Sequence, residues 1–201
     1  MTKWLGLVLL SLCAPALAQP GAAPTPAPST VRVTLQTSLG TIVLELETRR
    51  APITAGNFLR YVDQRRLDGT NFYRAMRITP ETGLVQGGVR DPRRLFPPIA
   101  HEPTSRTGLA HVDGAISMAR TTPGSAQMDY FIMLGPAPSY DANPGAGGDD
   151  LGFAVFGRVV EGMEVVRRIH QAPTSPTLGE GVMRGQMLEP QIRIITARRT
   201  G

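Results

Sequence analysis

Apolar and polar residues alternate along two neighbouring stretches of the chain, residues 31–36 and residues 42–47. A period of two is typical of a β-strand with one buried face. The segment between them, Ser38-Leu39-Gly40, suits a tight turn. The two stretches are therefore predicted to form a β-hairpin.

The pattern becomes helical after Pro52, where apolar residues recur at helical spacing: Ile53, Phe58, Leu59 and Val62. Proline is favoured in the first turn of a helix, and polar residues lie between the apolar ones. A second, shorter helix is predicted over residues 162–170. The other strand-like segments are short and separated by glycine- and proline-rich loops: residues 70–76, 84–86, 114–119, 130–134, 153–160 and 191–197. Many short strands with only two helices favour an all-β sandwich or barrel.

The first eighteen residues have the pattern of a signal peptide. Lys3 supplies the positive charge, residues 4–12 are apolar, and Ala16-Leu17-Ala18 matches a cleavage site before Gln19. The apolar stretch is too short for an ordinary transmembrane helix. A lipid anchor at Cys13 is the alternative, but the bulky residue before this cysteine disfavours it.

The rest of the chain divides into a linker and one domain. Residues 19–30 are rich in proline and alanine and are predicted to form an extended tether. Residues 31–199 are assigned to one folded domain, which the length of 201 residues and the apolar content of 41% allow. Cleavage after Ala18 would leave no cysteine, so the mature domain needs no disulfide.

Charge and composition exclude several classes of function. The net charge of +5 comes almost wholly from arginine, but the arginines are scattered and not interleaved with aromatic residues. A nucleic acid is therefore not an expected partner. His101-Glu102 has no second histidine four residues on, and the three histidines lack metal-ligand spacing, so each is interpreted as a hydrogen-bonded loop or helix-end residue. No G-x-S-x-G or P-loop motif occurs, and we expect no metal and no cofactor.

A series of short motifs follows in a fixed order along the chain. They are Leu39-Gly40-x-Ile42, Ala51-Pro52-x-Thr54-x-x-Asn57-Phe58, Phe72-Tyr73-Arg74, Gln86-Gly87-Gly88, Ile116-Ser117-Met118-Ala119-Arg120, Tyr130-Phe131-Ile132, and Phe153 to Val159. In this order they resemble the cyclophilin family of peptidyl-prolyl cis–trans isomerases, in its bacterial exported branch. The resemblance extends from about Val31 to Ala197.

The resemblance implies a mainly β fold, a closed eight-stranded antiparallel barrel capped by two helices. Side chains such as Val33, Val43 and Phe156 would fill its interior, and the substrate groove would lie on its outer face. The implied activity is rotation about X–Pro bonds, which is slow because amide resonance sets a barrier of about 18–20 kcal/mol. An arginine that donates to the prolyl nitrogen only in the twisted state would lower that barrier.

The resemblance also implies the roles of individual residues. Arg74 would be the catalytic donor, and Gln86 would bind the substrate backbone and steady Arg74. Phe131 would form the floor of the proline pocket, Leu84 one wall, and Ala119 a backbone contact. The full set of predicted substrate-binding residues is Phe72, Leu84, Met118, Ala119, Arg120, Phe131, Tyr140 and Phe153.

Three positions depart from the family pattern. Gly83 stands where an aromatic wall of the pocket is expected, so either the wall is missing or Met76 fills it. Tyr140 follows a serine in place of an aromatic residue and would cover the pocket alone. Asp129 replaces a neutral glutamine, and we expect it to pair with Arg74 and modulate catalysis; the alternative is that it turns towards Arg120 or water.

The predicted function is therefore isomerisation of X–Pro bonds in exported proteins, which assists their folding. The expected partners are proline-containing segments of unfolded or folding chains, and the protein itself is expected to be a periplasmic monomer. The alternative function is a proline-peptide-binding module or holdase with weak or no isomerase activity. A purely structural barrel is a third interpretation.

Overall fold

The barrel begins with the hairpin that the alternating pattern predicts. In the computed structural model, which describes Met1 and residues 29–200, β1 (Val31–Thr37) pairs antiparallel with β2 (Gly40–Leu46) around the turn. Both strands bury one face, since every second side chain points into the core. The predicted signal peptide and most of the predicted linker lie outside the described residues.

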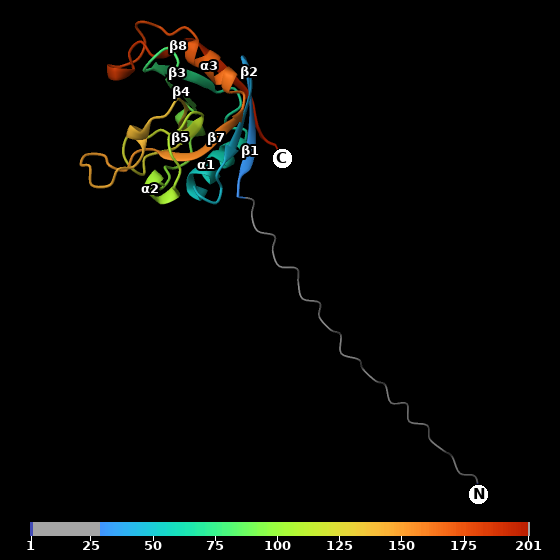
Figure 1. The fold of residues 1–201 in the computed structure, drawn as a ribbon. Helices are drawn as coiled ribbons and strands as arrows, with labels where there is room; N and C mark the ends of the chain where they lie inside the picture. The colour runs from blue at the N-terminus through green and yellow to red at the C-terminus, as the bar shows by residue number, and fades with distance from the viewer. Residues whose placement is uncertain (2–28, 201) are drawn as a thin grey trace.

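Eight strands within residues 29–200 close into a barrel (Figure 1). The other six are β3 (Asn71–Arg77), β4 (Gly83–Gly88), β5 (Ala115–Met118), β6 (Asp129–Leu134), β7 (Ala154–Glu161) and β8 (Met187–Arg199). Their order around the barrel is β1-β2-β7-β5-β6-β4-β3-β8, and all neighbours are antiparallel. The predicted closed eight-stranded antiparallel barrel is confirmed.

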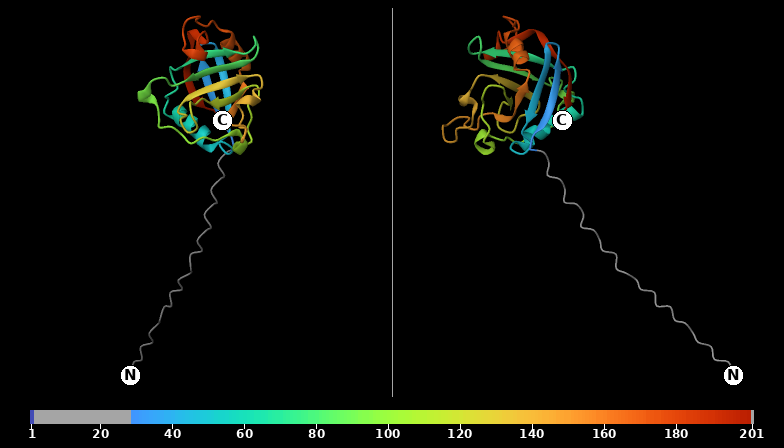
Figure 2. Two further views of the ribbon diagram at one scale, coloured as in Figure 1. Left: turned by 90° about the vertical axis from the view of Figure 1, so that its left-hand side faces the viewer. Right: turned by 45° about the vertical axis from the view of Figure 1, so that its right-hand side comes forward.

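The two predicted helices cover opposite ends of the barrel (Figures 1 and 2). α1 (Pro52–Asp63) packs on β7 and β8, whereas α3 (Met163–Gln171) packs on β2, β3 and β4. A short third helix, α2 (Thr104–Thr107), was not predicted, because four residues give no helical period. The loops also contain three single 3₁₀ turns, η1 (Pro92–Arg94), η2 (Pro138–Tyr140) and η3 (Gly181–Met183). None of the helices within residues 29–200 has the length and apolar character needed to span a bilayer.

Aromatic rings fill the middle of the barrel. Phe58 from α1 reaches between the strands, with its ring centroid 5.3 Å from Tyr130 and 5.4 Å from Phe156. Val33 and Phe156 are fully buried in this core, as predicted. Val43 is not: on β2 it alternates with the buried Ile42 and Leu44 and is only half-buried, so its assignment to the interior was wrong.

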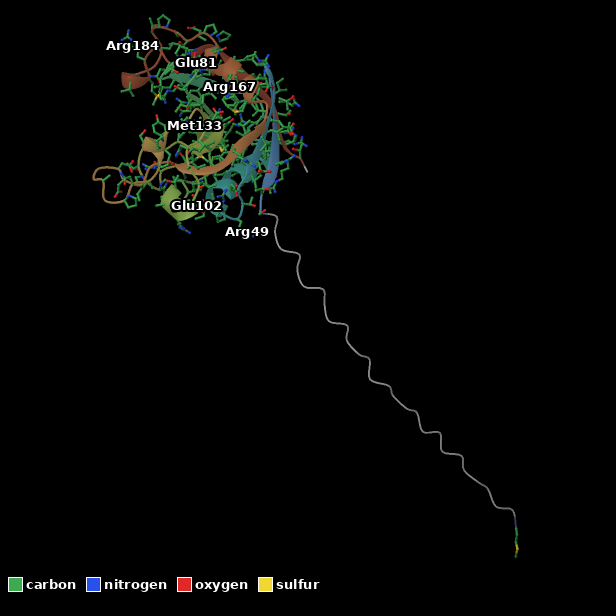
Figure 3. All side chains as sticks on the ribbon, in the orientation of Figure 1. Arg49, Glu81, Glu102, Met133, Arg167 and Arg184 are labelled. Carbon is green, nitrogen blue, oxygen red and sulfur yellow. The ribbon has the colours of Figure 1, made fainter. Side chains whose placement is uncertain are left out.

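The first turn of α1 is capped by a residue distant in sequence. Ala51 at the N-cap has no side-chain oxygen to offer. Instead Glu102, labelled in Figure 3, accepts from the backbone N–H groups of Ile53 (3.2 Å) and Thr54 (2.7 Å). The same carboxylate accepts from the hydroxyl of Thr54 at 2.7 Å and is only 1% exposed. The loop that carries Glu102 is thereby fastened to the end of the barrel covered by α1.

Candidate functional site

The register of the strands places the predicted site residues in one row on the outer face of the barrel. Arg74 on β3 lies opposite Gln86 on β4, and Gln86 lies opposite Phe131 on β6. Phe131 in turn faces Ser117 on β5. Directly opposite side chains are about 4.5–5.5 Å apart at Cβ. An arginine, a glutamine and an aromatic ring therefore sit side by side although they come from three strands.

A second outer row lies beside the first. Met76 on β3 is opposite Leu84 on β4, which is opposite Met133 on β6. Together the two rows underlie an apolar patch, called the outer cluster below. Its buried members are Leu84, Ala115, Phe131, Met133, Ala137 and Val155, and Met76, Leu109, Ala119, Tyr140 and Phe153 pack against them.

Phe131 is the centre of the outer cluster. Its ring centroid lies 5.9 Å from Tyr140 and 5.4 Å from Phe153, both edge-on. Phe131 is nearly buried while the other two rings are partly exposed, so Phe131 forms a floor with aromatic side walls. The structure therefore brings five of the predicted substrate-binding residues into one cluster: Leu84, Ala119, Phe131, Tyr140 and Phe153.

Met76 occupies the side where the sequence lacks an aromatic wall. It packs against the outer cluster, and its sulfur lies 4.0 Å from the hydroxyl of Tyr140. Gly83 is needed for a different reason: it has a φ of 147°, and a Cβ there would approach the carbonyl oxygen of Met76 to 2.0 Å. Of the two possibilities for this wall, the structure favours the one in which Met76 fills it.

Phe72 was predicted to contact substrate, and the structure corrects this. Between Phe72 and Arg74 the pairing advances by two residues on β3 but by only one on β4, so Tyr73 is the extra residue of a β-bulge. The bulge lets Phe72 point inward while Arg74 points outward. Phe72 is fully buried in the interior core, with its ring 5.9 Å from Tyr130.

The predicted contact of Met118 with substrate is also corrected, for a simpler reason. Successive residues of a strand face opposite sides. Ala115 and Ala119 belong to the outer cluster, whereas Ile116 and Met118 belong to the interior core. The side chain of Met118 is therefore core packing and is closed to a peptide on the outer face.

The guanidinium of Arg74 is held by two glutamines. Its Nη1 donates to Oε1 of Gln86 at 2.9 Å. Its Nε and Nη2 both donate to Oε1 of Gln186, at 2.9 Å and 2.7 Å. An arginine has five N–H groups, so two of them have no partner among the described residues and can serve a ligand.

Arg74 remains a cation despite its partly buried position. Burial lowers the pKa of its guanidinium below the usual value, because desolvation disfavours the charged form. The ordinary value is so far above neutrality that the group stays protonated. Both of its hydrogen-bond acceptors are neutral amides, so the positive charge is not neutralised by a carboxylate.

A hydrogen-bonded chain supports the floor of the outer cluster from behind. His111 donates from Nδ1 to Asp141 at 2.6 Å, and its Nε2 lies 3.0 Å from the hydroxyl of Ser117. Its ring is parallel to that of Phe131, with centroids 6.0 Å apart. Burial lowers the pKa of His111, against the opposing effect of Asp141, so the imidazole is neutral at neutral pH.

The order Ser117–His111–Asp141 is that of a hydrolytic triad, but its position excludes that chemistry. Ser117 is 0% and His111 is 1% exposed. A nucleophile must reach a substrate carbonyl, and this hydroxyl is sealed beneath the outer cluster. These three hydrogen-bonded residues therefore support the ring of Phe131 from beneath. All three histidines are hydrogen-bonded loop or helix-end residues, as interpreted from the sequence.

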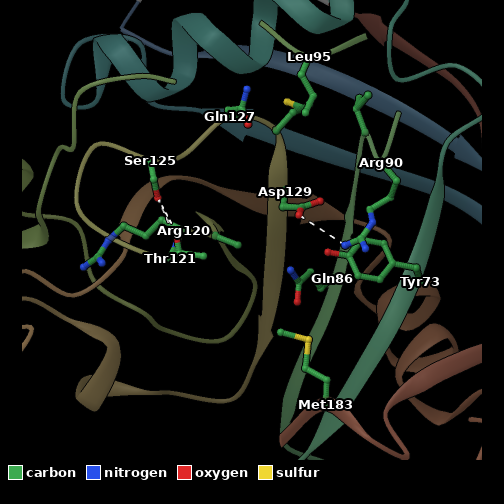
Figure 4. A pocket seen from close by; sticks show the side chains of 13 residues that line it. Tyr73, Gln86, Arg90, Leu95, Arg120, Thr121, Ser125, Gln127, Asp129 and Met183 are labelled. Atoms are coloured by element: carbon green, nitrogen blue, oxygen red, sulfur yellow. Dashed lines mark hydrogen bonds and ion pairs between the residues drawn. The ribbon is translucent and has the colours of Figure 1, made fainter. Parts of the chain in front are cut away.

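A polar pocket of about 330 Å³ adjoins the outer cluster (Figure 4). Ala119 belongs to both, and Gln86, which pairs with Phe131, also lines the pocket. Tyr73, Arg90 and Asp129 lie on one side and Arg120, Thr121 and Ser125 on another, while Met183 reaches the pocket from η3. The polar pocket and the outer cluster are therefore neighbours.

Asp129 does not pair with Arg74, so the predicted partner was wrong. Its carboxylate lies 3.8 Å from the guanidinium of Arg90, which stacks over the ring of Tyr73 at 4.7 Å (Figure 4). The alternative partner, Arg120, is engaged elsewhere. Asp129 pairs with Gly88 at the end of β4, which places it beyond Gln86 on the side away from the outer cluster.

Arg120 lines the polar pocket, but its charged group is already occupied. Its guanidinium forms two hydrogen bonds with Asp149, at 2.6 Å and 2.8 Å, and also donates to the carbonyl of Gly152. The side chain is only 2% exposed and lies over the ring of Phe153 at 5.3 Å. We expected Arg120 to bind substrate; the structure instead shows its guanidinium bracing the 141–152 loop and Phe153.

Asp129 gives a testable pH dependence of stability. Burial raises the pKa of its carboxyl above the ordinary value, and Arg90 and Tyr73 only partly oppose this. As pH rises from about 4, the usual aspartate value, the unfolded chain releases this proton first, and folding stability declines until the folded pKa is passed. Asp129→Asn should therefore be more stable than the parent at pH 7, and this advantage should shrink as pH falls towards 4. Urea titrations at several pH values measure it, and an advantage that is equal at every pH would contradict the assignment.

Comparison with known proteins agrees with this geometry. Residues 32–198 match the family model described as cyclophilin type peptidyl-prolyl cis-trans isomerase/CLD. The chain belongs to the cyclophilin family. A peptidyl-prolyl cis-trans isomerase of Acinetobacter baylyi is 37% identical over 148 residues, which cover 71% of this chain and 73% of the relative. Peptidyl-prolyl cis-trans isomerase A of Dickeya dadantii is 37% identical over 153 residues, or 74% and 75% of the two chains.

Solved cyclophilin structures share the fold. A cyclophilin type isomerase of Cryptosporidium parvum superposes with a TM-score of 0.64 at 18% identity, covering 86% of this chain and 98% of its own. A second crystal structure of that protein, determined in the presence of the dipeptide Ala-Pro, gives a TM-score of 0.63. At this identity the likeness concerns the barrel alone.

Three residues around the site were not found from the sequence. Gln186, which holds Arg74, is 112 positions away from it, and Arg90, which pairs with Asp129, follows a glycine pair with no periodic pattern. Asp141, which holds His111, directly follows Tyr140 in the sequence but was assigned no role there. None of these contacts has a spacing in the sequence that could reveal it.

Proposed function

We propose that this cyclophilin accelerates rotation about X–Pro bonds by using Arg74 as a fixed hydrogen-bond donor. The observation that carries the proposal is the cross-strand row in which Arg74, Gln86 and Phe131 are neighbours. A proline ring on Phe131 would bring its amide nitrogen within reach of the free N–H groups of Arg74. No other charged group in the described row competes for that position.

The chemistry follows from the difference between planar and twisted amides. In the planar amide the nitrogen lone pair is delocalised and accepts hydrogen bonds poorly. In the twisted state the nitrogen becomes pyramidal and basic, so a donor already in place stabilises that state selectively. Because Arg74 is partly buried and held by two amides, little reorganisation is needed when the bond rotates.

Gln86 would bind the peptide next to the rotating bond. Its Oε1 accepts from Arg74, which leaves its Nε2 as the end that can donate to a peptide carbonyl. The outer cluster would hold the proline ring, while the polar pocket would take the residues that precede it. The peptide is thus held on one side of the X–Pro bond while the group on the other side rotates.

A protease-coupled proline-isomerisation assay on the mature protein tests this function. Appreciable acceleration of a short X–Pro peptide supports the isomerase. Tight binding of the peptide without acceleration would instead support a proline-peptide-binding module or holdase. The sequence support for that alternative was Asp129 and the altered wall; with Asp129 beside Arg90 and Met76 at the wall, neither feature opposes catalysis by Arg74.

We further propose that the protein acts on exported chains in the periplasm. The support is the sequence of residues 1–18, with Lys3, an apolar stretch and an Ala-x-Ala site. Proline-containing segments of unfolded or folding exported proteins would then be its substrates, and it would act as a monomer.

Export makes a direct prediction about the mature chain. Cleavage after Ala18 should give a periplasmic protein that begins at Gln19 and contains no thiol. Intact-mass analysis of the periplasmic fraction measures this. A lipid-modified chain that begins at Cys13, or an uncleaved chain in the cytoplasm, would refute it.

A further inference from the structure

Gln186 accepts more hydrogen bonds from the guanidinium of Arg74 than any other described residue. A single atom, its Oε1, accepts from both Nε (2.9 Å) and Nη2 (2.7 Å) of the guanidinium. These two N–H groups lie on the same edge of the planar fork, so one oxygen can receive both. The edge is thereby fixed in direction, whereas Gln86 holds only Nη1.

Gln186 is itself anchored at three points. Its side-chain Nε2 donates to the carbonyl of Val182 at 2.7 Å, which forces Oε1 to face the arginine. Its backbone N–H donates to Met183 at 3.0 Å, and its carbonyl accepts from Ala75 at 2.9 Å. The glutamine is therefore locked both to the turn η3 and to β3, next to the residue that it holds.

This arrangement reduces the conformational entropy that Arg74 would lose on binding substrate. A free arginine samples many rotamers, and fixing one of them costs conformational entropy. Two amide oxygens on different edges of Arg74 select one orientation before substrate arrives. The two N–H groups of Arg74 that neither glutamine receives are then the ones left for a substrate.

The two glutamines that hold Arg74, called the clamp below, are uncharged, and this matters as much as their geometry. A carboxylate at position 186 could accept the same two N–H groups, and bidentate arginine–carboxylate pairs are stronger than amide contacts. It would also place a negative charge beside the donor and weaken its action on a weakly basic nitrogen. An amide orients Arg74 and leaves the positive charge of its guanidinium uncompensated.

We propose that Gln186 is a positioning residue for the isomerase reaction, which orients Arg74 from the loop that borders the polar pocket. The inference rests on the proposed role of Arg74. It assigns a catalytic function to the 175–186 loop, which is far from the other site residues in sequence. Met183, from the turn that anchors Gln186, lines the polar pocket, so the same loop contacts the pocket and holds the arginine.

The test compares kcat and KM, measured separately on the mature protein, for Gln186→Ala, Gln186→Glu and the control Gln191→Ala. Gln191 is an exposed glutamine on β8. We expect Gln186→Ala to lower kcat about tenfold and to change KM less than about twofold, because misplacing a catalytic group affects the chemical step most. Gln186→Glu keeps acceptor oxygens for Arg74 but loses the donor to Val182, and it should also lower kcat. Gln191→Ala should change neither constant.

A spectroscopic readout separates positioning from a structural role. The Arg74 Nε–H resonance, assigned by its absence in Arg74→Lys, should exchange with water slowly in the parent and faster in Gln186→Ala. Gln191→Ala should leave it unchanged. If Gln186→Ala folds poorly, Gln186→Glu carries the kinetic test, since it preserves size and the two acceptor contacts.

Combination with Arg74→Ala distinguishes the two ways in which the inference can fail. In the Arg74→Ala background, Gln186→Ala should cause no further loss of kcat. If Arg74→Ala lowers turnover but neither Gln186 variant does, the clamp is wrong and the function of Arg74 stands. If Arg74→Ala turns over as the parent does, the proposed role of Arg74 is itself wrong and the clamp falls with it.

Discussion

Replacing Arg74 by alanine is expected to lower kcat/KM by about 10²-fold or more, the usual loss when one preorganised donor to a transition state is removed. The side chain lies on the outer face, next to Gln86 and Gln186, and contributes nothing to the interior core. The melting temperature should therefore change little. A protease-coupled assay gives the rate, and a thermal melt followed by circular dichroism gives the stability.

The matched control is Arg106→Ala. Arg106 is an exposed arginine on α2, so the substitution removes the same charge without touching the row on the outer face. It should retain parental kcat/KM. Parental turnover in Arg74→Ala would remove this arginine from the mechanism, and an equal loss in both variants would indicate a general effect of charge.

Replacing Glu102 by alanine is expected to lower the free energy of unfolding by about 3 kcal/mol, because buried N–H and O–H donors left unpaired cost about 1–3 kcal/mol each. The carboxylate accepts from two backbone N–H groups at the start of α1 and from the hydroxyl of Thr54. Ala51 has no side-chain group that could replace it. Urea unfolding at neutral pH measures the change.

Glu102→Gln and Glu164→Ala sharpen this test. Glu102→Gln keeps one acceptor oxygen and should lose less stability than Glu102→Ala. Glu164 is an exposed acidic residue in the first turn of α3. Its loss should cost less than about 1 kcal/mol, the range of a helix-dipole effect. If Glu102→Ala and Glu164→Ala lowered the free energy of unfolding equally, the hydrogen bonds from α1 to Glu102 would add no stability beyond a helix-dipole effect.

The predictions for Arg74 and Glu102 concern hydrogen-bonded charged side chains, one expected to contribute to turnover and the other to stability. Arg74 and Glu102 are both charged side chains that form several hydrogen bonds, each to at least one partner far away in the sequence. The partners of Arg74 leave N–H groups free for a substrate, whereas the oxygens of Glu102 are used by α1. The first residue should therefore affect turnover and the second stability.

Local pattern was sufficient for much of the fold. Alternation along residues 31–36 and 42–47 predicted the first hairpin, because a strand with one buried face must show a period of two. The spacing of Phe58, Leu59 and Val62 predicted α1, since its apolar side must meet the barrel. Pattern alone left a sandwich and a barrel open. The resemblance of the ordered motifs to the cyclophilin family implied the closed barrel and the roles of Arg74, Gln86 and Phe131.

Tertiary structure alone decided which way several of these side chains face and what they contact. The bulge at Tyr73 turns Phe72 inward and Arg74 outward, and it exists only because β3 pairs with β4. Asp129 meets Arg90 instead of Arg74, and Arg120 is occupied by Asp149. Gln186 reaches Arg74 across 112 residues. A sequence records periodicity along one strand, but contacts between strands depend on register and barrel closure, which form only when the whole chain folds.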